Sequence, residues 1–273
     1  MLPMLIVLTY SLLPPALGLA GSASWNSLDH GLSLGEFAVK TGPAGKGCGI
    51  TILRIDSQFY DFRLFAASEH EQKSRTVSQW TEEFSLVAAI NASMYQGADH
   101  LRSTGYMRNY RHNNNPNINR SFGAFMAFNP VDPSLPQVQI IDRRLQKDWK
   151  DLIERYHSVV QNYRMVSFGK KRGWPQRSQR HGTAAIGLDA ENRVMFILSR
   201  APFSTHDLIH ALLSLPINIQ SAMYVEGGPQ AALHLRTGSR NMTWTGICEA
   251  NFIAPDSAFE FEIPNVIGIS KRK

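Results

Sequence analysis

The 273-residue sequence predicts a single α+β domain, in which a mixed, strand-rich sheet is flanked by a few helices. Short apolar segments that alternate with period two recur along most of the chain, whereas stretches with helical spacing are few. Hydrophobic residues make up 43% of the chain and charged residues 18%. This composition fits one globular domain with a sizeable core.

Residues 1–23 predict a signal peptide, followed by a mature domain at 24–273. The leader contains no charged side chain, its apolar run is interrupted by Pro14-Pro15, and small residues extend to Ala23. We therefore expect export to the periplasm or secretion. The leader lacks a positive n-region, so an uncleaved anchor or a misassigned start is the alternative. No later segment of the sequence is apolar enough to span a membrane.

The first half of the mature chain predicts a hairpin, a helix and a buried strand, at residues 49–65, 76–84 and 86–90. The two hairpin strands alternate with period two around Ser57-Gln58. In the helix, Trp80 and Phe84 are four residues apart and share one face. Residues 95–121 are rich in glycine, asparagine and arginine without an apolar period, which predicts a long loop of the functional or disordered kind.

The second half continues this alternation of elements. We expect helices at residues 147–156 and 204–215, a basic loop at 169–182 and a hairpin at 183–198. The other expected strands are at 122–128, 138–141, 159–160, 163–168, 222–226, 231–235 and 266–269. Ser204 predicts the N-cap of the last helix, because Asp207 follows three residues later as in a capping box. That helix stops before Pro216.

The net charge of +6 and the pI of about 9.4 indicate anionic partners such as phosphate, acidic glycans or the envelope surface, with peripheral association. Basic residues gather at 102–120, 143–150 and 170–180. We expect no nucleic acid partner, because no recognition helix, aromatic RNA-binding pattern or zinc finger accompanies the charge.

The two cysteines, Cys48 and Cys248, lie near opposite ends of the mature domain. In an exported protein they fit a disulfide that closes nearly the whole fold, and two unpaired buried thiols are the alternative. We expect no metal and no cofactor, since the histidines show no paired-ligand spacing with these cysteines.

The most informative segment, residues 222–229, leads an apolar strand into Glu226, Gly227 and Gly228. A strand that ends in this way presents a carboxylate at the rim of a sheet, and the glycines let a substrate approach closely. A polar exit from a hairpin is the alternative interpretation.

Further polar candidates lie at strand ends or in the loops beside them: Asn91, Tyr95, Arg164, Arg180 and His181. Arginine binds phosphate bidentately, and a carboxyl group can act on a glycosidic oxygen or on water. These groups could hold a sugar joined to phosphate. Structural roles are the alternatives: a turn for Asn91, a surface aromatic for Tyr95 and a solvated strand position for Arg164.

The order of several short motifs resembles that of the phosphodiester glycosidase family. The motifs stand at residues 91–95, 105–107, 122–128, 159–166, 182–187 and 224–228 and extend over most of the mature chain. The resemblance implies a hydrolase that cleaves a sugar 1-phosphodiester, with a sugar phosphate or anionic glycan as substrate.

The resemblance also implies roles for individual residues. Glu226, Asn91 and Tyr95 are the expected catalytic residues, and the substrate-binding residues are Arg164, Arg180, His181, Thr183, Gly227 and Gly228. Two positions depart from the family pattern: Glu226 stands where aspartate is usual, and Pro229 stands where a small or polar residue is common.

Two other functions compete with an exported glycosyl phosphodiester hydrolase. A non-catalytic envelope protein could bind an anionic glycan in the same groove, and turnover would separate the two. An ordinary glycosidase would require a second carboxylate close to Glu226, for which Asp99 is the nearby candidate.

Overall fold

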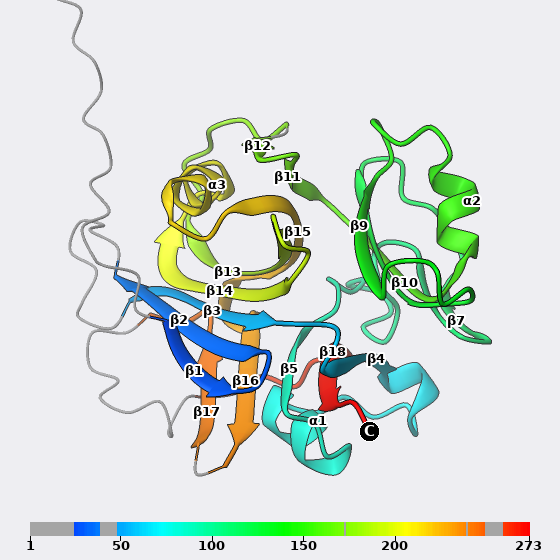
Figure 1. Ribbon diagram of the computed structural model, residues 1–273, viewed down its shortest axis with the longest axis horizontal. Coiled ribbons are helices and arrows are strands. Elements are labelled where there is room, and N and C mark those ends of the chain that lie inside the picture. The colour runs from blue at the N-terminus through cyan, green and yellow to red at the C-terminus, as the bar shows by residue number, and fades with distance from the viewer. Residues whose placement is uncertain (1–24, 39–47, 172, 239, 249–258) are drawn as a thin grey trace, which may run out of the picture.

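The computed structural model describes residues 25–38, 48–171, 173–238, 240–248 and 259–273 (Figure 1). The expected leader at 1–23 lies outside them. The strands of the described residues form three sheets, in which every strand pair is antiparallel. The strand-rich α+β class is confirmed. Three sheets replace the expected one, because alternation identifies strands without specifying their partners.

The largest sheet contains eight strands. Their spatial order is β1 (Trp25–Asp29), β2 (Leu32–Ala38), β3 (Gly49–Ile55), β14 (Val194–Phe203), β13 (His181–Asp189), β15 (Ile219–Gly227), β11 (Arg164–Ser167) and β12 (Lys170–Lys171).

The other two sheets contain five strands each. The second sheet has the order β7 (His112–Asn115), β6 (Met107–Asn109), β10 (Tyr156–Asn162), β8 (Ala124–Pro130) and β9 (Val138–Asp142). The third has the order β17 (Arg240–Thr245), β16 (Ala232–Thr237), β5 (Ala88–Asn91), β18 (Asn265–Lys271) and β4 (Tyr60–Ala66).

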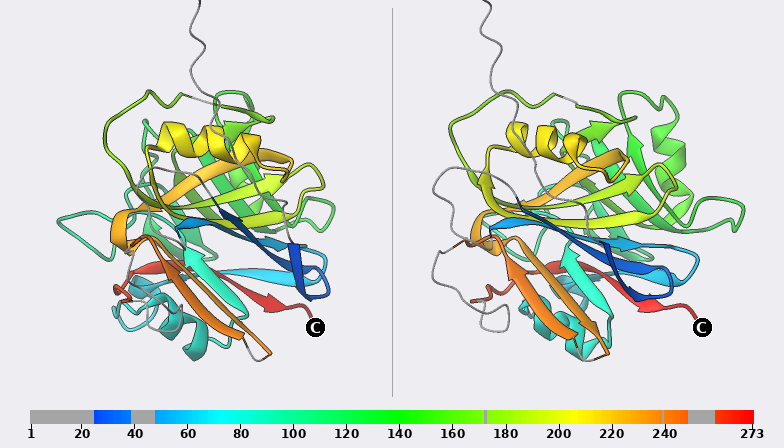
Figure 2. Two further views of the ribbon diagram at one scale, coloured as in Figure 1. Left: turned by 90° about the vertical axis from the view of Figure 1, so that its left-hand side faces the viewer. Right: turned by 60° about the vertical axis from the view of Figure 1, so that its left-hand side comes forward.

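Each sheet carries one α-helix on the side away from a shared core. The helices are α1 (Val77–Glu83) on the third sheet, α2 (Trp149–Glu154) on the second and α3 (Thr205–Ser214) on the largest. Figure 2 shows the largest sheet between α3 and the strands of the third sheet. Short 3₁₀ helices, η1 (Ala67–Glu69) and η2 (Gly228–Gln230), follow β4 and β15.

Period-two alternation explains how the three sheets share one core. In β13, Ala184 enters the central cluster and Ala185 packs on the α3 side. In β8, Met126 enters the same central cluster and Phe125 packs with α2. Strand residues are therefore buried on both faces, which accounts for the nearly continuous apolar runs in the sequence.

The predicted hairpin at 49–65 is wrong in its pairing. Both strands form, but β3 pairs with β2 and β14, whereas β4 pairs with β18 in another sheet. The turn between them is local: the side chain of Asp56 accepts a hydrogen bond from the backbone of Gln58 at 2.9 Å. A tight turn can thus link strands of different sheets, and the sequence signal for the two cases is the same.

The predicted loop at 95–121 also needs correction, because it contains the hairpin of β6 and β7. These strands lack apolar alternation, since their side chains form polar contacts. Asn114 donates to the side chain of Ser68 at 2.8 Å and to the backbone oxygen of Leu101 at 2.7 Å.

The hairpin of β13 and β14 and the helix after Ser204 are confirmed. Asp189 accepts from the backbone of Glu191 and Arg193, at 3.0 and 2.9 Å, which closes the hairpin turn. Ser204 caps α3 by accepting from the backbone of Asp207 at 3.1 Å. Local chemistry defines both elements.

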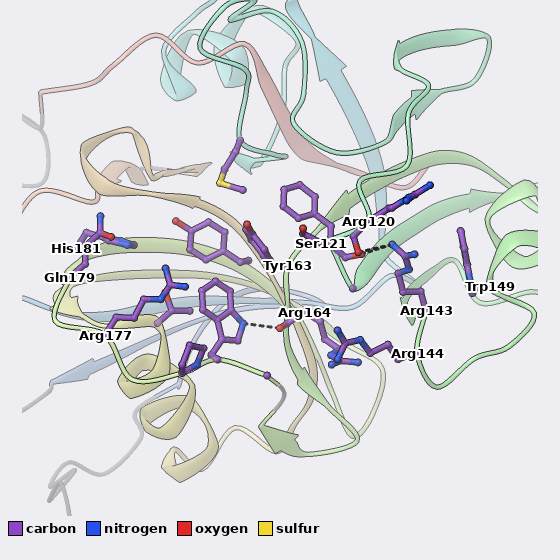
Figure 3. A pocket seen from close by; sticks show the side chains of 18 residues that line it. Arg120, Ser121, Arg143, Arg144, Trp149, Tyr163, Arg164, Arg177, Gln179 and His181 are labelled. Carbon is purple, nitrogen blue, oxygen red and sulfur yellow. Dashed lines mark hydrogen bonds between the residues drawn. The ribbon is translucent and has the colours of Figure 1, made fainter.

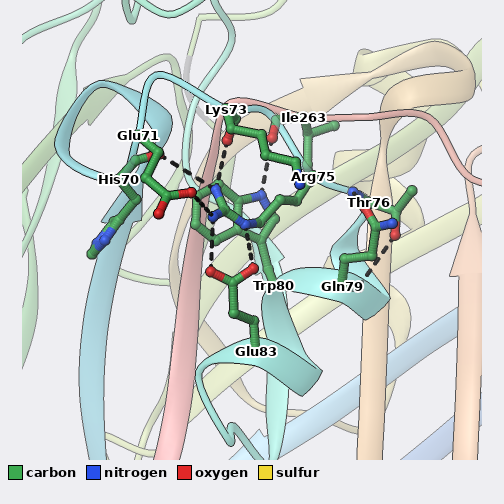
Figure 4. A network of polar contacts seen from close by, with 9 residues as sticks. All are labelled: His70, Glu71, Lys73, Arg75, Thr76, Gln79, Trp80, Glu83 and Ile263. Carbon is green, nitrogen blue, oxygen red and sulfur yellow. Dashed lines mark hydrogen bonds and ion pairs between the residues drawn. The ribbon is translucent and has the colours of Figure 1, made fainter.

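The predicted helix at 76–84 is confirmed as α1, and a buried arginine fixes its start (Figure 4). Thr76 closes a capping box at its N-terminus. Arg75 is 2% exposed and contacts Glu83 through Nε and Nη2, at 2.6 and 2.8 Å. Its Nη1 donates to the backbone oxygen of Lys73 at 2.7 Å, and its guanidinium lies 4.7 Å from the ring centroid of Trp80.

Cys48 and Cys248 form a disulfide, with Cα atoms 5.7 Å apart and a sequence separation of 200. Of the two alternatives that the sequence left open, the bonded one is therefore present. Among the described helices, none combines the length and apolar character that a membrane crossing requires.

Candidate active site

Glu226 lies near the end of β15, inside the largest sheet, between β13 and β11. Across the pair with β13, Ala184 faces Glu226 and Thr183 faces Gly227. The register shifts between Ala184 and Ala185, directly beside Glu226. Such a β-bulge redirects side chains and is frequent next to active sites.

The carboxyl group of Glu226 is nearly enclosed, with the residue 7% exposed. Burial raises its pKa from 4.5 to about 7, against the lowering effect of the Gly227 N–H, which donates to Oε1 at 2.8 Å. A carboxyl group with this pKa exchanges a proton near neutral pH, as a general acid or base must.

Two phenols lie close enough to Glu226 to sense its charge. Burial raises the pKa of Tyr95, and the negative charge of Glu226 raises it further. The same two causes, in the same order, raise the pKa of Tyr224. Both phenols therefore stay protonated beside the carboxylate and can donate hydrogen bonds.

Gly227 allows an approach that any other residue would block. A Cβ at this position would lie 2.0 Å from the hydroxyl of Tyr224 and 2.7 Å from Cε1 of His181. Nδ1 of His181 is 2.8 Å from the backbone oxygen of Gly182, which can only accept, so Nδ1 carries the proton. Thr183 is fully buried, with its hydroxyl 3.3 Å from the same nitrogen.

A cavity of about 530 Å³ opens beside this group (Figure 3). Glu226 itself is not part of its lining, but Tyr224 and His181 are, and both lie against Gly227. The aromatic lining residues are Phe122, Trp149, Tyr163, Trp174 and Tyr224. Aromatic walls with a few polar groups are typical of ligand sites.

The cavity is strongly basic. Within the described residues, its lining includes five arginines and neither aspartate nor glutamate: Arg120, Arg143, Arg144, Arg164 and Arg177. They come from strand β11 and from the three basic stretches of the sequence. Folding thus gathers charges that are distant along the chain around one space, which suits an anionic ligand.

Arg164 is held at the cavity by Asp142. Its Nη1 lies 2.7 and 2.9 Å from the two carboxylate oxygens, and the side chains are 10% and 6% exposed. Burial opposes ionisation of Asp142, but hydrogen bonds from Ser167, the backbone of Arg144 and Arg164 outweigh it and lower the pKa. The pair therefore stays charged.

Two other predicted site residues have partners outside the cavity. The amide of Asn91 donates to the backbone oxygen of Gln230 at 3.0 Å and accepts from the backbone of Ala232 at 2.7 Å, which ties β5 to β16. Arg180 is half-exposed and lies 3.1 Å from Asp207, and it does not line the cavity.

The remaining candidates are Gly228, the first residue of η2, and Asp99, which stands beside a turn. Gly228 has a φ of +76° and open space around the position of a Cβ. Asp99 is exposed, and its carboxylate accepts from the backbone of Leu101 at 3.2 Å. That carboxylate caps a turn, so it offers no support for a second acid beside Glu226.

Sequence reasoning missed Tyr224 and four of the five cavity arginines. Tyr224 could have been found, because it stands two residues before Glu226 on the same strand. The arginines belong to the basic stretches that composition had already marked, but their convergence is a tertiary property.

No group of three or more histidine, cysteine, aspartate or glutamate residues that could hold a metal ion occurs among the described residues.

Comparison with known proteins agrees with this picture. A sequence model of the phosphodiester glycosidase family matches residues 84–270. The fold and the match define a hydrolase of the glycosidase type. The chain belongs to the phosphodiester glycosidase family, as the motif order predicts.

Two solved structures share the fold at 12% identity and a TM-score of 0.60 each. One is the catalytic domain of zebrafish N-acetylglucosamine-1-phosphodiester alpha-N-acetylglucosaminidase, auto-inhibited by pro-peptide, with 92% of this chain and 87% of that one covered. The other is a hypothetical protein from Synechocystis, with 93% of this chain but 64% of that one covered. A search of curated proteins finds no match.

Proposed function

We propose that this protein is exported and hydrolyses a glycosyl phosphodiester, releasing the free sugar and a phosphomonoester. The observation that carries the proposal is the buried carboxyl group of Glu226, with a pKa of about 7, next to a basic cavity. The family match supports a phosphodiester as the linkage that is cleaved.

A single carboxylate suits this reaction. Most glycosidases use two, because an alcohol leaves poorly unless an acid protonates it. A phosphomonoester has a second pKa of about 6, so it can leave without a proton when cations stabilise its charge. The described cavity lining offers arginines and no carboxylate that could serve beside Glu226, which matches a phosphate leaving group.

In the proposed reaction Glu226 acts as the general base. Its carboxylate takes a proton from water, the water oxygen bonds to C1 of the sugar, and the bond between C1 and the phosphate oxygen breaks. The electron pair of that bond remains on the phosphate. Tyr95 donates a hydrogen bond to the substrate, and Asn91 positions the ends of β5 and β16 around it.

Six residues bind substrate in this proposal. Arg164 and Arg180 attract the phosphodiester. Nε2 of His181 faces the substrate, and the hydroxyl of Thr183 holds the imidazole ring of His181 in place. The backbone at Gly227 and Gly228 accommodates the sugar, since no Cβ stands in the way.

Export is supported by the disulfide, because such bonds persist in oxidising compartments such as the periplasm or the extracellular space. The pI of about 9.4 supports a peripheral association with an anionic envelope.

The second candidate is a non-catalytic protein that binds an anionic glycan. It is favoured by the position of Glu226 outside the cavity lining. The two are separated by incubating the protein with a panel of sugar 1-phosphodiesters in ¹⁸O-labelled water. The proposed hydrolase places the label on the sugar, P–O cleavage would place it on the phosphate, and a binder would leave every substrate intact.

A further inference from the structure

Three arginines form a cluster at one end of the cavity. In Figure 3, Arg120, Arg143 and Arg144 lie, with Trp149, on the side of the cavity opposite His181. Because His181 lies against Gly227, next to Glu226, the arginine cluster is at the end far from the carboxyl group.

The cluster is held in place by the fold. Nη1 of Arg143 donates to the backbone oxygens of Asn119 and Phe122, at 3.0 and 3.1 Å, and its guanidinium is 5.2 Å from the ring centroid of Trp149. The backbone nitrogen of Arg144 donates to Asp142 at 3.0 Å. Within the described residues no partner occupies Nε or Nη2 of Arg143, so two donor groups remain for a ligand.

The cluster also lacks compensating charge. Arg164 is neutralised by Asp142, whereas Arg120, Arg143 and Arg144 form no ion pair with any described residue. Like charges that share a small space repel one another, and an anion bound between them would offset that repulsion. One phosphodiester carries a single negative charge, which Arg177 at the rest of the lining already matches.

We propose that the arginine cluster is a second anion subsite, which binds a further phosphate on the aglycone. The substrate class is then a glycosyl phosphodiester whose leaving group carries another phosphate at a fixed distance from the bond that is cleaved. This inference rests on the proposed function for the position of the first phosphate.

Binding can be measured without turnover. The probes are α,ω-alkanediol bisphosphates of increasing chain length, each compared by calorimetry with the monophosphate of the same length. Two subsites at a fixed separation predict an optimum length, at which the bisphosphate binds about tenfold or more tightly than its monophosphate, since a charge-assisted contact is worth that much. Equal affinity of both probes at every length would overturn the proposal.

The matched variants are Arg120→Gln with Arg144→Gln, and Arg236→Gln as control. Arg120 and Arg144 are exposed, so replacing them leaves the fold intact. Arg236 is also exposed, on β16, and does not line the cavity. We expect the double variant to lose the bisphosphate advantage and the control to retain it. If the control lost the bisphosphate advantage to the same extent, the effect would come from net charge, and the subsite would be refuted.

Turnover distinguishes this inference from the function on which it rests. If no sugar 1-phosphodiester is hydrolysed but the length optimum persists, hydrolysis fails and the subsite stands. If hydrolysis occurs without a length optimum, the hydrolase stands and the subsite fails.

Discussion

The backbone N–H of Gly227 donates to Oε1 of Glu226 at 2.8 Å, so the residue that follows the carboxylate also binds it. This bond stabilises the ionised form, yet burial dominates and holds the pKa at about 7. The carboxyl group is therefore poised between its two forms at neutral pH.

Glu226→Gln is expected to lower turnover of a sugar 1-phosphodiester by about 10²–10⁴-fold, because the amide is nearly isosteric but accepts no proton. As a general base, wild-type Glu226 should give a kcat/KM that rises with pH through about 7. Glu36→Gln, an exposed change on β2, is the control and should leave the rate unchanged. A profile that falls through pH 7 would assign Glu226 as an acid.

The same variant should change how stability depends on pH. Because the folded pKa of about 7 lies above 4.5, the folded state retains a proton that the unfolded state has released. The stability contribution of Glu226 is complete below pH 4.5 and is lost as the pH rises through about 7, a loss on the order of 3 kcal/mol.

Urea denaturation at pH 5 and pH 8 measures this effect. The free energy of unfolding of wild type should be lower at pH 8 than at pH 5, because the buried carboxyl group of Glu226 ionises. Glu226→Gln should not show this loss, so it should be more stable than wild type at pH 8. If Glu226→Gln lowered the free energy of unfolding by the same amount at both pH values, the ionised carboxyl group of wild-type Glu226 would not be buried.

Gly227→Ala and Gly228→Ala form a matched pair. At Gly227 the new methyl group would meet Tyr224 and His181, so we expect those rings to be displaced and turnover to be lost. At Gly228 it meets no protein atom, so we expect a smaller loss of turnover, limited to the space that the sugar needs, and a stability cost of about 1–2 kcal/mol from the positive φ. Equal rates in the two variants would show that the packing around Gly227 is unimportant for catalysis.

Replacing both cysteines by alanine should lower the unfolding free energy by roughly 5 kcal/mol, because the disulfide closes a loop of 200 residues. Thermal unfolding with and without reductant measures this loss. Peptide mapping of non-reduced protein should recover Cys48 linked to Cys248. If both cysteines are alkylated without reduction, the protein does not contain the bond.

Elements with local signals could be predicted from the sequence. The capping residue Ser204 and the Asp189 turn each act within a few positions, and the structure has both. The partner of β4 could not be predicted, because it is β18, about 200 residues away, and the intervening turn resembles that of a hairpin. Pairing between distant strands is specified by packing across the core.

The site was predictable to a similar extent. Glu226 was identifiable because a carboxylate directly follows an apolar strand and precedes two glycines. The pairing of Arg164 with Asp142 was not, since β9 and β11 lie in different sheets and meet only after folding. Whether an arginine contacts a ligand or a carboxylate is decided by such distant neighbours.

Arg164 and Arg180 differ in how closely they can approach the phosphodiester. Arg164 lines the cavity, whereas Arg180 is half-exposed and paired with Asp207. We expect Arg164→Gln, made together with Asp142→Asn to avoid an unpaired buried charge, to weaken phosphodiester binding by about 1.5–3 kcal/mol. Arg180→Gln should weaken it less, because exposed charges are screened.

A neutral glycoside of the same sugar is the control substrate. It lacks the negative charge, so its binding should change little in either variant, and raised salt should mimic part of the Arg180 effect. The deciding quantity is the ratio of the binding constant for the phosphodiester to that for the neutral glycoside, measured for wild type and both variants. If both variants keep the wild-type ratio, neither arginine interacts with phosphate, and the basic surface serves to hold the protein near an anionic envelope.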